Sequence, residues 1–358
     1  MDASLTADHM RRSFLTLTIA LSLLVRAPLH ADDLVFGRFS DLLDSLRLQA
    51  GIPGLSASIV GSTAVLWEHA YGQQDAQQAI AARPDTPFEL DGTTQTFTAE
   101  LVLRCVEEGR LNLDTRIGAY DLDAPEPDAT LRQLLSHTNA AGVFSYQPDR
   151  LAPLTYAVRA CRDGSFRKTV SSLLDQLAMI DSVPGLDAPT LRPPAEGIPT
   201  TTQAARYSLS LTRLAVPYAV DASGRATASQ YTTTSLTPSS GLISTTRDLA
   251  QFDLALKSGV LLQSGTLAAA WKAPIDAGGH AQPHGLGWFV QQYNGEQIVW
   301  QFGVSSSGSS SLMLTVPGRS ATLILLANSS GLSQPFGLSA GDVTASPFAK
   351  LFLGTFVR

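Results

Sequence analysis

The chain has 358 residues, of which 44% are apolar and 16% are charged, and its formal net charge is −6. This is the composition of an ordinary globular protein with enough chain for a large core. No long run of Lys or Arg occurs, so neither nucleic acid nor an anionic membrane surface is favoured as a partner.

The N-terminus has the composition of an export signal. Met10-Arg-Arg12 is basic, Ser13 to Val25 is apolar, and Leu29-His-Ala31 is a suitable cleavage site. The apolar run is shorter than the about 20 residues that a transmembrane helix needs. The paired arginines also fit a twin-arginine signal, with an ordinary secretory signal as the alternative. We therefore predict a signal peptide at residues 1–31, no stable membrane span, and a mature domain at 32–358 that is exported, periplasmic or secreted.

The mature chain begins with an amphipathic pattern at residues 34–49, which predicts a helix with one apolar face. Residues 55–60 and 64–71 are typical of two strands of a hairpin, and a polar connector follows. Phe88-Glu-Leu90 is strand-like and leads into a buried helix that ends near Glu108, because apolar residues recur there at helical spacing.

The middle of the chain is predicted to be mostly helical. Thr130 is a suitable N-cap for a short helix at 130–137, and further helical patterns cover residues 151–162 and 166–178. The Pro- and Thr-rich residues 183–204 predict a long loop, and residues 205–237 predict irregular structure with short strands.

The last third of the chain is rich in strand patterns. A capped helix is expected at residues 241–256, with Ser244 or Thr245 as its N-cap. Strands are then expected, and a final helix; their residues are 284–293, 297–302, 309–316, 321–327 and 347–356. Strands at both ends of the chain indicate one sheet closed by the N- and C-terminal segments, with a helical lobe between them.

The two cysteines, Cys105 and Cys161, fall on apolar positions of predicted helices. An exported location permits a disulfide, but a core of this size does not need one. We therefore predict two buried free thiols. No Cys/His cluster accompanies them, so we expect no metal, and no cofactor is indicated.

Several segments together resemble the superfamily of serine β-lactamases, penicillin-binding proteins and related esterases. In chain order these segments are residues 88–99, 106–114, 134–138, 174–179, 241–250 and 285–288. The resemblance implies a β-lactamase/transpeptidase-like fold of the α/β (α+β) class. In it, an antiparallel sheet flanked by N- and C-terminal helices would come from about 32–90 and 240–358, and a mostly helical lobe from about 91–239.

The superfamily places a nucleophilic Ser at the start of the buried helix and a Lys one turn later. Gly92 and Gln95 stand at these two positions. Glycine has no side chain to acylate, and an amide does not take up a proton near neutral pH. Thr93 and Thr94 lie about 100° and 200° around a helix from the position of the nucleophile, so neither simply replaces it.

The other two motifs of the superfamily are altered as well. Its Tyr-x-Asn loop corresponds to Tyr146 and Pro148, and Pro148 offers no side-chain hydrogen bond. Its Lys/His-x-Gly strand corresponds to Gln301 and Gly303, where an amide replaces the ionisable side chain. The resemblance therefore implies a cleft that has lost its chemistry at all three walls.

We predict a catalytically degenerate protein that keeps the fold and a ligand-binding cleft for a small molecule or a peptidoglycan fragment. The predicted substrate-binding residues are Gly92, Gln95, Tyr146, Gln301 and Gly303, with no catalytic residue. The alternative is an active esterase or β-lactamase-like hydrolase that uses Tyr146 with a hydroxyl of Thr93, Thr94 or the polar turn 305–311. A third possibility is an inert protein with a closed cleft. The oligomeric state is left open.

Overall fold

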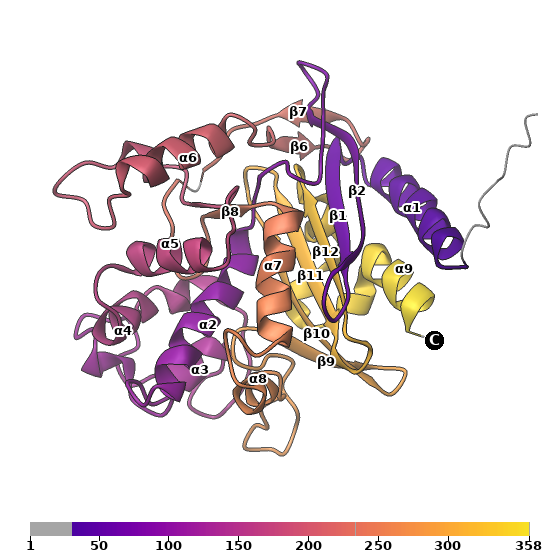
Figure 1. The fold of residues 1–358 in the computed structure, drawn as a ribbon. Helices are drawn as coiled ribbons and strands as arrows, with labels where there is room; N and C mark the ends of the chain where they lie inside the picture. The colour runs from indigo at the N-terminus through magenta and orange to yellow at the C-terminus, as the bar shows by residue number, and fades with distance from the viewer. Residues whose placement is uncertain (1–30, 233, 358) are drawn as a thin grey trace, which may run out of the picture.

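A computed structural model describes residues 31–232 and 234–357 (Figure 1). The predicted signal peptide therefore lies outside the described residues, except for Ala31. The centre of the fold is a seven-stranded antiparallel sheet with the order β3-β2-β1-β12-β11-β10-β9. Its strands are β1 (Gly54–Val60), β2 (Val65–Asp75), β3 (Ile80–Ala81), β9 (Phe289–Tyr293), β10 (Glu296–Val304), β11 (Ser310–Val316) and β12 (Ala321–Ala327).

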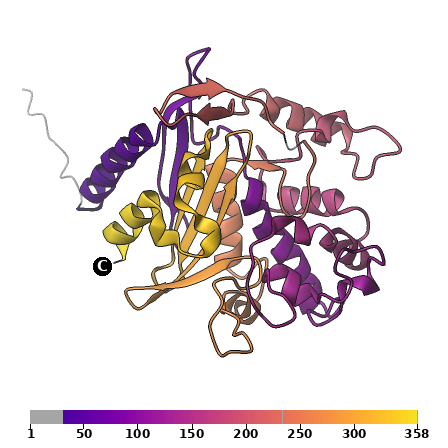
Figure 2. The ribbon, with the colours of Figure 1, turned by 180° about the vertical axis from the view of Figure 1, so that it is seen from behind.

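The N- and C-terminal strands close the sheet, as the sequence predicted. β1 lies antiparallel to β12, with Leu55 opposite Ala327 and Val60 opposite Thr322. The helices α1 (Ala31–Gln49) and α9 (Pro347–Phe356) pack together behind the sheet, where Figure 2 shows α9 across the strands. Both faces of the sheet are therefore covered, and β12 is apolar along almost its whole length.

Alternate residues of β12 belong to two different cores. Leu323 and Leu325 pack with α1 and α9, whereas Ile324 and Leu326 face the helices on the other side. On that side α7 (Thr246–Lys257) lies over the sheet, and Phe97 of α2 (Thr94–Glu107) stacks on its Phe252 with ring centroids 4.0 Å apart. This stacking anchors the buried helix that begins at the candidate site.

The helical lobe lies beside the sheet and carries α3 (Leu131–Leu135), α4 (Leu154–Cys161), α5 (Phe166–Gln176) and α6 (Thr201–Leu211) (Figure 1). Helix α8 (Ser264–Ala270) follows α7 and is drawn below it in Figure 1. A small antiparallel sheet joins β4 (Phe88–Glu89), β8 (Leu242–Ser244) and β5 (Val183–Pro184), and a separate hairpin is formed by β6 (Tyr218–Val220) and β7 (Ala226–Ala228). Within the described residues, no helix is long and apolar enough to cross a membrane.

Two expectations about the lobe are wrong. Residues 201–211 form a helix, because Thr200 accepts a hydrogen bond from the Gln203 backbone N–H and Gln203 bonds back to Thr200 in a capping box. Cys105 and Cys161 are not free thiols but form a disulfide that joins α2 to α4. Packing of these two helices brings their Cα atoms to 6.1 Å, within the range that a disulfide spans.

Candidate active site

The candidate site begins where β4 leads into α2 through a short 3-10 turn at Asp91–Thr93. The sequence suggests that Gly92 supplies the conformational freedom at this turn. Instead, the left-handed residue is Asp91, with φ of 48°, a conformation in which a non-glycine residue is uncommon. Gly92 is required for a different reason, which is the close approach of a neighbouring strand.

Strand β10 lies directly against the start of this turn. A Cβ atom on Gly92 would overlap the carbonyl oxygen of Phe302 and lie 3.0 Å from the Tyr146 hydroxyl. A Cβ atom on Gly303 would overlap the carbonyl oxygen of Leu90 and lie 2.9 Å from the Gly92 nitrogen. The space beside Gly92, where a serine side chain would stand, is therefore filled by the protein itself.

Gln95 is held by two hydrogen bonds at the centre of the site. Its amide nitrogen donates to the Tyr146 hydroxyl at 2.8 Å, and its amide oxygen lies 2.9 Å from Nε2 of His137. Since an amide oxygen only accepts, His137 carries its proton on Nε2, and its Nδ1 accepts from the Gln147 backbone N–H at 3.3 Å. Gln95 and His137 are both 0% exposed, so the bond between them is closed to water.

Aromatic rings surround the hydrogen-bonded groups. The His137 ring lies edge-on to His284 at 4.8 Å, and the Tyr146 ring lies 5.4 Å from Phe302. Burial lowers the pKa of His284 to about 3 and lowers that of His137 well below its usual value, while burial raises the pKa of Tyr146. Both imidazoles are therefore neutral, and neither is suited to accept a proton near neutral pH.

Gln301 is fully buried, and its side chain forms hydrogen bonds with the backbone around it. Its amide nitrogen donates to the Gly287 carbonyl at 3.3 Å, and its amide oxygen accepts from the Phe302 N–H at 2.9 Å. The structure thus brings Gly92, Gln95, Tyr146 and Gly303 together as the motifs suggest, and it places the Gln301 amide behind them. Tyr146 keeps partial exposure, whereas the other four predicted site residues are buried.

The hydroxyl groups beside the helix start are bonded to neutral partners. Thr93 lies 2.8 Å from the Ser311 hydroxyl, which itself donates to the Leu90 carbonyl at 2.6 Å. The Thr94 hydroxyl accepts from the Leu242 N–H at 3.3 Å. These contacts leave neither threonine next to a base. The 305–311 segment is not an exposed turn, because Ser305, Ser307 and Ser309 to Ser311 are all buried.

Two acidic residues next to the site were missed by the sequence analysis. Ser309 donates to the Glu89 carboxylate at 2.9 Å, and these two side chains are 0% and 2% exposed. Burial and the nearby charge of Glu89 raise the pKa of Asp91 to about 7. The available signal was the acidic pair on either side of Leu90, but only the packing of β11 against the turn reveals its surroundings. Within residues 31–232 and 234–357, no group of three or more His, Cys, Asp or Glu side chains is arranged to hold a metal ion.

Comparison with known proteins identifies similar chains. The protein-family model described as Beta-lactamase matches residues 36–176 and 182–341. Protein flp of Staphylococcus aureus (strain NCTC 8325 / PS 47) is 33% identical over 99 residues, which is 26% of this chain and 20% of that protein. The chain therefore aligns with about a fifth of the length of this curated relative.

Solved structures resemble the whole fold at low sequence identity. The octameric penicillin-binding protein homologue from Pyrococcus abyssi has a TM-score of 0.70 at 19% identity, covering 89% of this chain and 77% of that one. The class C beta lactamase from Rhodobacter sphaeroides has a TM-score of 0.65 at 16% identity, covering 88% of this chain and 98% of that one. At these identities the likeness establishes the β-lactamase/transpeptidase-like fold.

Proposed function

The chain belongs to the Beta-lactamase family, and from this premise we propose that it is a catalytically degenerate member that keeps the fold without acyl transfer. The observation that carries the proposal is the closure of the site. The Phe302 carbonyl lies where a nucleophile on residue 92 would stand, and Gln95 is bonded to Tyr146 and His137.

The chemistry of acyl transfer supports this proposal. It needs a nucleophile within hydrogen-bond reach of a base, beside backbone N–H groups that bind the developing oxyanion. Gly92 has no nucleophile, Gln95 is not a base, and burial keeps His137 neutral. Loss of the nucleophile alone lowers the rate on the order of 10⁶-fold, leaving about 10³–10⁴ over the reaction in water.

A binding role for Gly92, Gln95, Tyr146, Gln301 and Gly303 stays a prediction. Four of them are buried, so a small molecule or peptidoglycan fragment would reach this set from the side of Tyr146 and Asp91, which are partly exposed. Deeper binding would require β10 to separate from the start of α2. The closure is therefore better suited to a structural or regulatory role than to turnover.

One observation supports the alternative of an active hydrolase. The Ser309 hydroxyl donates to Glu89 at 2.9 Å, which is the arrangement of a nucleophile and its base. Both side chains are at most 2% exposed, so a substrate has no direct access to them. This pair is the one to remove when residual activity is measured.

We also propose that the protein is exported. Its disulfide supports this location, because disulfides persist in oxidising compartments such as the periplasm and are rare in the cytosol. The predicted signal peptide is consistent with the same compartment.

The proposal is tested by assaying residues 32–358 and the variant Ser309→Ala with a chromogenic cephalosporin and with p-nitrophenyl esters. We expect no saturable turnover from either protein above the rate in buffer. Saturable turnover that disappears in Ser309→Ala would establish the alternative, and saturable turnover that persists in the variant would place the chemistry elsewhere in the fold.

A further inference from the structure

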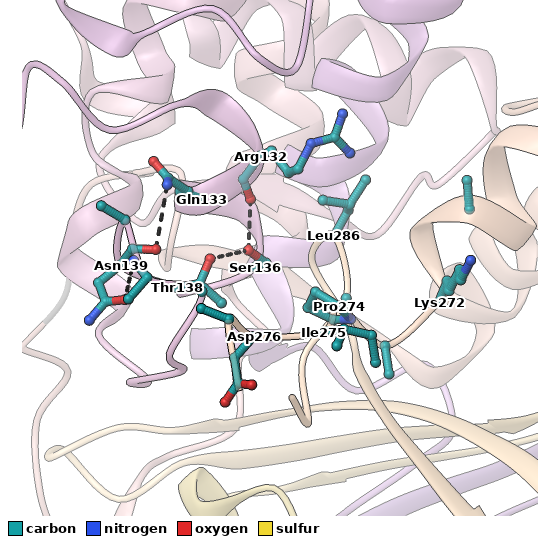
Figure 3. Close-up of a pocket in the computed structure, with 17 residues that line it drawn as sticks. Arg132, Gln133, Ser136, Thr138, Asn139, Lys272, Pro274, Ile275, Asp276 and Leu286 are labelled. Carbon is teal, nitrogen blue, oxygen red and sulfur yellow. Dashed lines mark hydrogen bonds between the residues drawn. The ribbon is translucent and has the colours of Figure 1, made fainter. Parts of the chain in front are cut away.

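A cavity of about 610 Å³ lies outside the closed site, between the segment that follows α3 and the segment that follows α8 (Figure 3). Its walls come from residues 132–142 and 269–286, and none of the five predicted site residues lines it. Its volume falls within the range of about 300–1,000 Å³ in which small-molecule sites occur.

One wall of this cavity is apolar. It is formed by Pro274, Ile275 and Leu286 together with alanines of α8 and the following loop. Ile275 is 59% exposed although it is a large apolar side chain. An apolar ligand group placed against this wall would remove that surface from water, which is worth roughly 25 cal/mol for each Å² buried.

The opposite wall is polar and has unused hydrogen-bonding capacity. Ser136 donates to the Arg132 carbonyl at 2.8 Å and receives the Thr138 hydroxyl at 2.8 Å, as Figure 3 shows. The Thr138 oxygen can therefore still accept a bond. Asn139 uses its side-chain oxygen to accept from the Ala141 and Val143 N–H groups, which leaves its amide nitrogen available to donate.

The charged groups on the lining differ in how they are partnered. The Arg132 guanidinium is paired with Asp114 at 2.8 Å. The Asp276 carboxylate accepts from the backbone N–H groups of Gly278 and His280 and from the Gln282 amide, and it lies 3.3 Å from Nδ1 of His280, so its oxygens are bonded within its own loop. Lys272, by contrast, makes no ion pair or side-chain hydrogen bond within the described part of the chain. Its ammonium group therefore has free donors next to an apolar wall.

We propose that this cavity binds a small amphiphilic carboxylate, a compact apolar body that carries one carboxylate group. The apolar body packs on Ile275 and Leu286, and the carboxylate pairs with Lys272, while the polar wall bonds to an amide or hydroxyl of the ligand. The proposal needs no catalysis and does not depend on the closed site. The wall segment 132–142 contains His137 and leads on to Tyr146. An occupant of the cavity would therefore contact the chain next to the closed site.

The experiment titrates N-acetyl-L-leucine into ¹⁵N-labelled protein (residues 32–358) and follows amide chemical shifts. A ligand of this size is expected to bind with a dissociation constant on the order of 1 mM. The shifts should saturate and concentrate in residues 132–142 and 269–286. N-acetyl-L-leucinamide, which lacks the carboxylate, should bind more weakly.

Variants separate the charge from the shape of the site. Lys272→Gln should weaken binding about fivefold, as expected for one exposed ion pair, and Lys272→Arg should retain it. Ala269→Phe should abolish binding by filling the cavity from the exposed end of α8. Lys168→Gln, which removes an exposed lysine of α5, is the matched control and should leave binding unchanged. Thermal unfolding of each variant checks that it is folded.

Three outcomes would overturn the proposal. The first is the absence of saturable shifts at roughly tens of millimolar ligand, well above the expected dissociation constant. The second is equal affinity for N-acetyl-L-leucine and N-acetyl-L-leucinamide. The third is a set of shifts centred on Gly92 and Tyr146. The last outcome would place the ligand in the family site. None of these outcomes bears on the proposal that the protein is catalytically degenerate, because that proposal is tested by turnover.

Discussion

Restoring the two lost catalytic residues by Gly92→Ser with Gln95→Lys should not restore acylation. The added Cβ at position 92 would overlap the Phe302 carbonyl oxygen, which is backbone and can move only with strand β10. The lysine at position 95 would be fully buried, and His137 would lose the acceptor for its Nε2 proton. The variant therefore disturbs a packed interior instead of reopening a cleft.

The expected loss of stability can be estimated from these contacts. Overpacking at residue 92 should cost about 1–3 kcal/mol. The unpaired His137 donor adds about 1–3 kcal/mol. Burial should lower the pKa of the new lysine by several units. At neutral pH, each unit of this decrease costs about 1.4 kcal/mol of stability, until the pKa has fallen to the pH of the experiment. The sum is on the order of 5 kcal/mol, a large part of the about 5–15 kcal/mol that keeps a domain folded.

The assay is labelling by a fluorescent penicillin, read on a gel, together with urea unfolding of the same variant. Gly92→Ala is the matched control, because it adds the Cβ without the buried lysine and should lose only the overpacking part. A stable double variant that labels stoichiometrically at position 92 would refute the reasoning. It would mean that β10 moves away from the helix start at little cost.

Two further predictions concern the helical lobe. The disulfide joins cysteines with a sequence separation of 56, so Cys105→Ala with Cys161→Ala should cost about 4 kcal/mol and lower the melting temperature by about 6 °C; an unchanged melting temperature would contradict the disulfide. Glu100 is 0% exposed, and burial raises its pKa from 4.5 to about 8. Its neutral form therefore stabilises the fold fully below pH 4.5, and this contribution is lost as the pH rises through about 8. Glu100→Gln should match the wild type at pH 4 and be more stable by about 4 kcal/mol at pH 8; equal urea midpoints at both values would count against this burial.

The sequence predicted the sheet because its strands and flanking helices carry strong periodic signals. The apolar runs that became β11 and β12 lie between clear turns, and the pattern at 347–356 coincides with α9. α6 was missed because its apolar side is weak and Leu209 points to solvent at 66% exposure. The disulfide was missed because pairing depends on how α2 and α4 pack, which is a tertiary property that periodicity does not contain.

The sequence predicted which residues lie together at the candidate site, but it did not predict that the site is closed. Alignment of motifs placed Gly92, Gln95, Tyr146 and Gly303 around one point, and the structure brings them together. The motifs carry no information on the distance between the backbone of β10 and the backbone at the start of α2. The contact of β10 with the start of α2, and the left-handed conformation of Asp91, arise from packing between segments about 200 residues apart.

The most direct test of the central claim is the intact mass of the wild-type protein (residues 32–358) after prolonged incubation with benzylpenicillin and with an activated ester. We predict that the mass stays unchanged, because residue 92 has no hydroxyl and the space beside it is filled. A stoichiometric increase equal to the acyl group, located on Ser309 or on any other serine by peptide mapping, would contradict this claim.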